Sequence, residues 1–382
     1  MVGDVTADPA TLVAAGEHVL ASIRGAKPGP TLVVVGSIHG NEPAGIRAAR
    51  RVATSLEAIA PRLAGEALFL AGNTRALARH ERYVDTDLNR AWTAGRIAKP
   101  GRESEDAELA EILAELDAAI ARARGDVYVV DLHTTSAGGV PFATLGDTLR
   151  NRAFASNFPV PIILGVEEQL DGTMLEYLNN RGCVTLGFEA GQHESHVAVD
   201  NHEALLWVAL AALEIVEPAD VPDLPRMKER LAVEGGGLRF VEIRYRHAIR
   251  EGDDFRMLPG FTNFDPITKG QALAHDWRGP VRAVEGGMIL MPLYQAKGND
   301  GFFIARRIKT FWLKLSAVLR RTGVGRLMHL MPGVRKHAND PSALIVNTHL
   351  ARLFPLQVFH LLGYRKLRWD EDFLVVTRRK FE

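Results

Sequence analysis

The 382-residue sequence has a single cysteine, Cys183, and a formal net charge of zero. One cysteine excludes a disulfide framework within the chain and any metal site built from cysteines alone. The first residues, MVGDVTADPATLVAAGEHVL, lack a basic segment followed by an apolar one, so we expect no signal peptide. No run of about 18 apolar residues is free of charge, which argues against a membrane-spanning helix. These features favour a cytoplasmic protein.

The zero net charge hides an uneven distribution along the chain. Residues 301–382 hold 16 Lys and Arg against 5 Asp and Glu, whereas residues 1–300 hold 30 against 41. A hydrophobic content of 47% with 24% charged residues is typical of a globular protein. The length is sufficient for about two or three domains, each with its own core. The opposite charges of the two parts indicate that they have different roles.

Residues 1–216 alternate short apolar, β-branched runs with longer Ala-rich runs of helical spacing. The predicted strands cover 31–36, 67–71, 127–130, 160–164 and 184–188, and the predicted helices cover 43–63, 105–124 and 202–216. This alternation predicts a domain of the α/β class, in which helices cover both faces of a sheet.

The remainder of the chain has a different pattern. Three prolines within residues 217–226 predict a linker. The alternating run Leu238–Tyr245 and the Gly-rich turns that follow predict a small β-rich module over residues 226–300. Residues 301–382 predict a basic, partly helical C-terminal extension, with a hairpin over Leu367–Thr377. The apolar positions at helical spacing in this extension are Ile304, Ile308, Phe311, Trp312, Leu315 and Leu319.

A polar segment, GSIHGNEPAG, directly follows the first predicted strand. His39 and Glu42 are three residues apart where this strand ends and a helix begins. His133, in DLHTT, follows the strand predicted at 127–130 in the same way. Because the carboxyl ends of strands in α/β sheets share one edge, we expect these three side chains to meet one divalent cation. Two histidines and one carboxylate suit a catalytic zinc ion, and the same set can hold iron.

A hydrolytic metal site also needs a group that moves protons. Glu189 follows the last strand of the series, so it is a further carboxylate at a strand end. Arg82, Asn89 and Arg90 lie in the loop after the second strand. Arginine can bind a carboxylate with two hydrogen bonds or polarise a carbonyl oxygen. Without the metal residues nearby, a solvated loop would be the simpler interpretation of these positions.

The segments GSIHGNEPAG, NTRA, RYVDTDLNR, DLHTT and FEAGQH occur in this order. Together they resemble the succinylglutamate desuccinylase/aspartoacylase family of the zinc carboxypeptidase-like superfamily. The resemblance extends over roughly residues 15–300. It implies an α/β/α sandwich with a mixed central sheet, followed by a β-rich module. It also implies removal of the acyl group from an N-acyl amino acid or hydrolysis of a related amide.

The resemblance implies catalytic roles for five residues. It implies that His39, Glu42 and His133 bind one zinc ion per chain. Glu189 is then the general acid and base, which deprotonates the attacking water and protonates the leaving nitrogen. Arg82 polarises the scissile carbonyl.

Other residues are implied to bind the substrate. Asn89 and Arg90 correspond to residues that hold a substrate carboxylate. Arg181 is the nearby candidate for a second carboxylate, although its offset from the family pattern differs. Tyr294 is the candidate for a tyrosine that the family brings in from the β-rich module. His193, in the GQH of the last segment, is expected to line the pocket.

Three functions are open at this point. The leading one is a zinc-dependent deacylase of N-acyl amino acids; the others are a zinc carboxypeptidase acting on peptide-like amides and a binding protein that keeps the metal pocket without turnover. The complete set of ligands plus Glu189 favours an enzyme. For the basic extension, opposite charge favours docking on the acidic part of the same chain or of a second subunit in a homo-oligomer. Peripheral contact with an anionic membrane is the next alternative, and nucleic-acid binding is least favoured.

Overall fold

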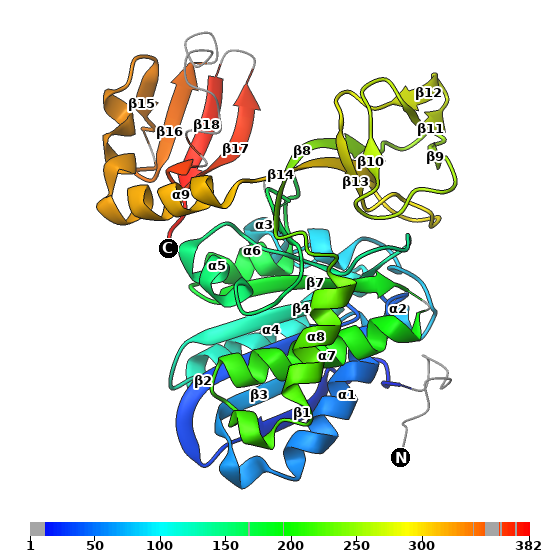
Figure 1. Ribbon diagram of the computed structural model, residues 1–382, viewed down its shortest axis with the longest axis vertical. Helices are drawn as coiled ribbons and strands as arrows, with labels where there is room; N and C mark the ends of the chain where they lie inside the picture. Colours follow the sequence, from blue (N-terminus) through cyan, green and yellow to red (C-terminus); the bar gives the residue numbers. More distant parts are fainter. Residues whose placement is uncertain are drawn as a thin grey trace.

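The chain folds into an α/β body with two smaller lobes above it (Figure 1). The yellow lobe contains β9 to β13 and the orange-red lobe contains α9 and β15 to β18. The computed structural model describes residues 12–166, 169–193, 195–338, 340–347, 359, 361–370 and 373–382.

An 11-stranded mixed sheet connects the body to the yellow lobe, with the strand order β1-β3-β2-β4-β7-β5-β6-β8-β14-β13-β10. Its strands in the body are β1 (Val19–Arg24), β2 (Lys27–Gly36), β3 (Ala64–Ala71), β4 (Val127–Thr135), β5 (Phe142–Thr144), β6 (Ile162–Leu164) and β7 (Val184–Gln192). The central strands β3, β2, β4 and β7 are parallel to one another. Leu32, Val33, Val34 and Val35 in β2 have no exposed surface, as expected for a strand covered on both faces. The predicted α/β fold with a mixed sheet is confirmed.

Helices cover both faces of this sheet. Leu32 and Val34 pack against α1, α5, α7 and α8 on one face, while Val33 and Val35 pack against α4 and α6 on the other. This separation follows from the alternation of side chains along a strand. The helices are α1 (Ala44–Glu57), α2 (Thr74–Leu77), α3 (Ala94–Ala98), α4 (Ser104–Arg122), α5 (Leu149–Ala155), α6 (Met174–Asn179), α7 (His196–Ala212) and α8 (Leu224–Glu234), with 3₁₀ turns η2 (Ala60–Arg62), η3 (Leu88–Arg90) and η4 (Pro218–Asp220). Within the described residues, no helix is long and apolar enough to cross a membrane.

The β-rich module is an extension of the central sheet. β8 (Phe240–Ala248) pairs with β6 of the body and with β14 (Asp300–Arg307). The other strands are β9 (Arg256–Met257), β10 (Pro266–Ile267), β11 (Ala272–Asp276), β12 (Gly279–Arg282) and β13 (Gly287–Leu290). The boundary expected at residue 301 therefore falls inside a strand. The segment expected to be a linker instead includes the start of α8, because Pro225 lies in the first helical turn, where its missing N–H is not required.

Beyond β14, the described part of residues 310–382 forms a C-terminal domain that is partly helical and also contains four strands. It contains α9 (Thr310–Thr322), η5 (Val324–Leu330), β15 (Val334–Lys336), β16 (Ala343–Asn347), β17 (Tyr364–Asp370) and β18 (Phe373–Arg378). The four strands form a separate antiparallel sheet whose core includes Val346 and Val376. The hairpin expected near the end of the chain corresponds to β17 and β18. Ile304 and Ile308, expected in the helix, lie outside α9, and Ile304 is buried in β14.

The C-terminal domain contacts the body next to α5 and α6. A guanidinium nitrogen of Arg320 lies 2.7 Å from Oδ2 of Asp147, and Arg320 also donates to the Asp147 carbonyl oxygen at 2.6 Å. The backbone N–H of Leu149 donates to the Glu382 carboxylate at 3.2 Å. Arg365 forms an ion pair with Glu176 of α6. The side chain of Arg320 is only 1% exposed, so this charge is removed from water at the contact.

Candidate metal and catalytic site

The predicted metal ligands come from two adjacent strands. β2 and β4 are parallel and pair Gly36 with Leu132, so the end of β2 lies beside His133. The chain turns sharply after β2, where Ser37 has a φ of 57°. Gly40 allows this turn to approach α2, since a Cβ on Gly40 would lie 2.3 Å from the backbone nitrogen of Leu77. A side chain at this position would displace the loop that carries the metal-binding residues.

The structure brings His39, Glu42 and His133 together. Their ligand-type atoms lie within 4.8 Å of one another. Nδ1 of His39 is 3.0 Å from one carboxylate oxygen of Glu42, and Nδ1 of His133 is 3.2 Å from the other. The Nε2 atoms face other carboxylates, at 3.2 Å from Asp87 and 2.8 Å from Asp131. A carboxylate behind each imidazole orients a metal-binding histidine, so this arrangement fits a site of two histidines and one carboxylate.

The charges of the cluster also fit a bound cation. Burial alone would raise the pKa of Glu42, but His39 and His133 hold it well below its usual range. Burial would lower the pKa of His133, but Asp131 and Glu42 raise it well above its usual range. Oδ1 of Asp131 and Oε2 of Glu189 are buried without a hydrogen-bond partner among the described residues. The cluster therefore holds acceptor oxygens and negative charge that a metal ion would neutralise.

Glu189 lies at the end of β7, where the register pairs it with His133 of β4. Burial raises the pKa of the Glu189 carboxyl to about 8. His133 and Arg82 lower this pKa, and the carboxylate of Glu42 raises it. A carboxyl whose pKa is close to neutral can both accept and donate a proton, so Glu189 is suited to general acid–base chemistry.

Arg82 and Asn89 are both in contact with the metal cluster. A guanidinium nitrogen of Arg82 lies 2.8 Å from Nε2 of His39 and 3.3 Å from the Asp87 carboxylate. Asp87 caps the turn η3 by accepting the backbone N–H of Asn89 at 2.9 Å. The side-chain nitrogen of Asn89 lies 3.5 Å from Nε2 of His133. The loop after β3 therefore brings Arg82 and Asn89 to the group formed by His39, Glu42 and His133.

Arg90 lies farther along the same cavity and is already paired. One of its guanidinium nitrogens is 3.2 Å from the carboxylate of Asp300 in β14, and another donates to the Asn89 carbonyl oxygen at 2.8 Å. Asp300 also forms an ion pair with Arg246 of β8. A substrate carboxylate at Arg90 would therefore share this guanidinium with Asp300.

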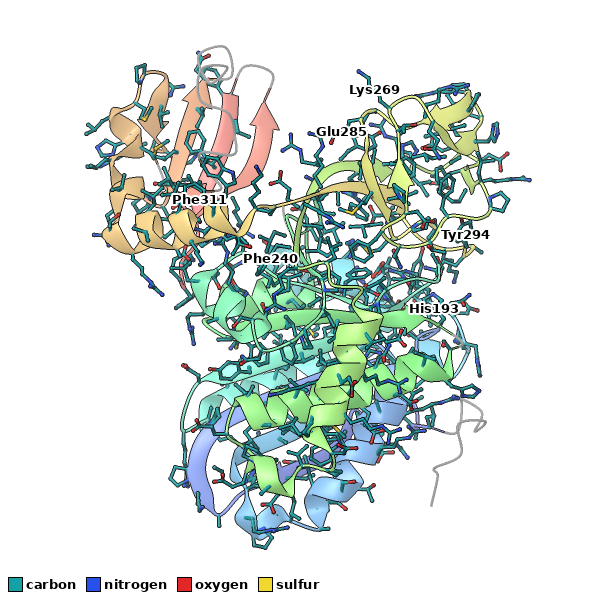
Figure 2. The ribbon with its side chains drawn as sticks, in the orientation of Figure 1. His193, Phe240, Lys269, Glu285, Tyr294 and Phe311 are labelled. Carbon is teal, nitrogen blue, oxygen red and sulfur yellow. The ribbon has the colours of Figure 1, made fainter. Side chains whose placement is uncertain are left out.

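His193 and Tyr294 have different positions relative to the site, and Figure 2 shows Tyr294 on the lobe above His193. His193 lines the cavity, with Nδ1 2.7 Å from the Thr134 hydroxyl and Nε2 3.2 Å from the Gln295 side chain. The Tyr294 hydroxyl donates to the Leu258 carbonyl oxygen at 2.8 Å, and Tyr294 is not among the residues that line the cavity. Because its hydroxyl is held within the lobe, Tyr294 does not take the position expected from the family pattern.

Arg181 also lies outside the cavity lining. It follows α6, and its guanidinium lies 2.5 Å from Asp117 of α4 and over the ring of Tyr177. Arg181 thus precedes the start of β7, whereas Glu189 lies toward the other end of that strand. The structure therefore does not bring Arg181 together with the other residues expected at the site.

The structure places several polar groups at the site for which the sequence predicted no role. Asp87 and Asp131, which face the two imidazoles, lie within RYVDTDLNR and DLHTT, and Asp131 precedes His133 by two residues. The backbone N–H of Thr134 donates to Glu42 at 2.8 Å. Asp300 comes from a strand more than 200 positions after Arg90, and no sequence signal links the two.

The site opens into a cavity of about 170 Å³. The metal cluster, Arg82, Glu189 and His193 contribute polar groups to its lining. The apolar part of the lining includes Leu145, Val166, Leu170, Leu175, Leu293 and Phe303. The lining thus combines charged groups with aliphatic side chains.

Known proteins share both the sequence pattern and the fold. Residues 28–211 match the family described as the succinylglutamate desuccinylase/aspartoacylase catalytic domain. A succinylglutamate desuccinylase of Pseudomonas aeruginosa (strain UCBPP-PA14) is 32% identical over 290 residues, which are 71% of this chain and 82% of that protein. A succinylglutamate desuccinylase of Pseudomonas paraeruginosa (strain DSM 24068 / PA7) is 34% identical over 110 residues, and this match spans 29% of the chain and only 32% of that relative.

Solved structures extend the similarity to the fold. The crystal structure of succinylglutamate desuccinylase/aspartoacylase from Rhodobacter sphaeroides matches with a TM-score of 0.56 at 18% identity, over 75% of this chain and 88% of that one. The product-bound ectoine utilization protein EutE (DoeB) from Ruegeria pomeroyi matches with a TM-score of 0.53 at 20% identity, over 75% and 87%. The identity and coverage of the Pseudomonas aeruginosa relative, together with this shared fold, confirm the family predicted from the sequence. The chain belongs to the succinylglutamate desuccinylase/aspartoacylase family.

Proposed function

We propose that this protein is a zinc-dependent hydrolase that cleaves the amide bond of an N-acyl amino acid or a related small carboxylate. The main support is that Nδ1 of both His39 and His133 faces Glu42, while Glu189 lies beside His133 in the sheet register. Membership of a family of deacylases supports amide hydrolysis as the reaction.

His39, Glu42 and His133 are the residues that would hold one zinc ion per chain. Two imidazoles and one carboxylate are a frequent protein ligand set of catalytic zinc, and they leave a position for water or substrate. Asp87 and Asp131 support this assignment because each faces the imidazole nitrogen that is turned away from Glu42. Zinc bound there supplies a Lewis acid that polarises the scissile carbonyl.

The chain's own residues then transfer the proton. The Glu189 carboxylate accepts a proton from the attacking water and returns it to the nitrogen of the leaving amine. Arg82, held at the metal cluster, donates hydrogen bonds to the carbonyl oxygen as negative charge develops there. Arg90 binds the carboxylate of the substrate, with Asn89 beside it on the turn η3.

We further propose that the C-terminal domain docks on the body of its own chain. The 2.7 Å contact between Arg320 and Asp147 and the ion pair between Arg365 and Glu176 support this arrangement. The excess of basic residues after residue 300 then has a structural use, since part of it neutralises acidic groups near α5 and α6.

The experiment is a hydrolysis screen on the full chain after loading with zinc, with and without a chelator. N-acyl amino acids should be cleaved to free amino acids, and the chelator should abolish the cleavage. Faster cleavage of dipeptides would favour a carboxypeptidase. Stoichiometric zinc binding without turnover of either class would favour a binding protein.

A further inference from the structure

We infer that the cavity selects a substrate with one carboxylate and an uncharged, apolar acyl group, rather than a substrate with two or three carboxylates. This inference rests on the proposed function, because it names the class of substrate for the same site. The names of the Pseudomonas relatives indicate that those proteins act on succinylglutamate, which carries three carboxylates. The substrate inferred for this chain carries only one.

The cavity has few cationic groups for a substrate. Among the described residues, Arg82 and Arg90 are the only Lys or Arg side chains in its lining. Arg82 is engaged by His39 and Asp87 at the metal cluster. A carboxylate removed from water without a cationic partner is strongly unfavourable. Arg90 therefore remains as the single cation that a substrate carboxylate can use.

Acidic groups on the same wall reduce the capacity for anions further. Asp300 already accepts from Arg90, at 3.2 Å. Glu176 also lines the cavity, where it is paired with Arg365 of the C-terminal domain. Among the described residues, the lining thus has two cations, Arg82 and Arg90, against six carboxyl groups, those of Glu42, Asp87, Asp131, Glu176, Glu189 and Asp300. A second substrate carboxylate would meet like charge and no free cation.

Leu175 and Thr144 line the cavity close to the strand that carries Glu189. Gly187 precedes Glu189 by two residues in β7, so the two positions face the same side of the strand. A Cβ on Gly187 would lie 2.5 Å from the Thr144 hydroxyl and 3.3 Å from Cδ1 of Leu175. Thr144 and Leu175 therefore pack closely against β7 at Gly187, and all three residues line the cavity.

Further aliphatic side chains continue this wall. Val166 and Leu170 line the cavity and pack against the cluster that contains Phe303. An alkyl acyl group is the chemistry that such a wall recognises, because burial of its methylenes is favourable. Each methylene that is buried against these aliphatic side chains should raise affinity about fourfold.

The test separates binding from turnover by using Glu189→Gln loaded with zinc. Calorimetry measures its dissociation constants for N-pentanoyl-leucine, N-acetyl-leucine, N-succinyl-leucine and N-succinyl-glutamate. The pentanoyl compound should bind at least about tenfold more tightly than the acetyl compound, because three methylenes are added. It should also bind at least about tenfold more tightly than N-succinyl-glutamate, whose additional carboxylates lack cationic partners. Tighter binding of N-succinyl-glutamate, or no binding of the pentanoyl compound, would overturn the inference.

The wild-type enzyme with zinc is then assayed for cleavage of the same four compounds. If N-pentanoyl-leucine binds best but none of the four is cleaved, the proposed hydrolase function fails while the selectivity of the cavity stands. A higher kcat/KM for N-pentanoyl-leucine than for N-succinyl-glutamate supports both.

A pair of variants tests the cause of the selectivity. Leu175→Arg adds a cation to the cavity lining, and Leu175→Gln adds a polar side chain without charge. In each variant, the affinity for N-succinyl-leucine is divided by the affinity for N-pentanoyl-leucine. This ratio should be at least about tenfold higher in the arginine variant than in the glutamine variant, because only arginine pairs with the added carboxylate. If both Leu175 variants unfold at the same temperature as the wild type and have the same affinity ratio, the lack of a cationic partner does not cause the selectivity.

Discussion

Asp147→Asn should loosen the contact between the C-terminal domain and the body. Asp147 accepts from Arg320 of α9 at 2.7 Å and from Arg152 of α5 at 2.7 Å. The side chains of Arg320 and Asp147 are 1% and 10% exposed. Replacing the carboxylate with an amide keeps the size of the side chain but leaves a buried guanidinium with less compensating charge.

The expected loss follows from this burial. Removing one partner of a buried ion pair costs about 3–5 kcal/mol, because the other charge remains out of water. The matched control is Asp126→Asn, whose carboxylate lies 3.0 Å from Arg150 and whose side chain is 62% exposed. An exposed pair of this kind contributes only about 0–1 kcal/mol.

Hydrogen exchange at the start of α5 measures the opening of the contact, since the Leu149 N–H donates to Glu382 of the C-terminal domain. Asp147→Asn should lower the free energy of opening by about 3–5 kcal/mol, and Asp126→Asn should change it by less than about 1 kcal/mol. Equal, small effects of the two substitutions would refute the claim that the buried pair holds the domains together.

The same contact should depend on pH. Burial alone would raise the pKa of Asp147, but Arg320 and Arg152 hold it well below its usual range. The folded chain therefore binds fewer protons at this site than the unfolded chain does. The contribution of Asp147 is complete above the ordinary aspartate pKa of about 3.9 and is lost as the pH falls through the lowered pKa. The free energy of opening obtained from exchange at the start of α5 should fall in acid more in the wild type than in Asp147→Asn.

Four further predictions concern the site. Glu189→Gln should keep its zinc and lose about 10²–10⁴ in kcat, measured by metal analysis and hydrolysis. In chelator-treated protein, burial raises the pKa of Glu189 to about 8, so the folded chain binds more protons than the unfolded chain between about pH 4.5 and 8. Stability in urea should therefore fall as the pH rises through that window, and this component should be absent from Glu189→Gln. Gly40→Ala should destabilise the fold by about 1–3 kcal/mol, because the loop approaches α2 closely there. The control Gly95→Ala should not destabilise the fold, since a Cβ at Gly95 meets nothing within 4 Å. Equal unfolding midpoints of the two variants would contradict the close approach at Gly40. His133→Ala should leave the purified protein without stoichiometric zinc.

The main strands and the metal cluster could be predicted because local pattern and burial agree there. Val33 and Val35 lie in an apolar run that only a covered strand accommodates, and the actual β2 includes the predicted residues 31–36. His39 and Glu42 directly follow that strand, so the sheet topology alone brings them to the edge where β4 ends.

Other features depend on contacts that a single sequence does not reveal. Ile304 and Ile308 fit a helical face, but pairing of β14 with β8 and β13 places Ile304 in a sheet. Arg181 is close to Glu189 in sequence, but it turns toward Asp117 of α4. Tyr294 is bound to the backbone of its own lobe. In each case, a long-range partner decides between local alternatives that are similar in energy.

The central claim is that this chain hydrolyses an N-acyl amino acid with zinc held by His39, Glu42 and His133. The most direct test measures zinc content and initial rates of N-pentanoyl-leucine cleavage in the same samples of wild type, chelator-treated wild type and reloaded wild type. We predict about one zinc per chain in the active samples, as expected for a single catalytic site, loss of cleavage with the metal and recovery on reloading. Full cleavage by the protein freed of metal would contradict the claim.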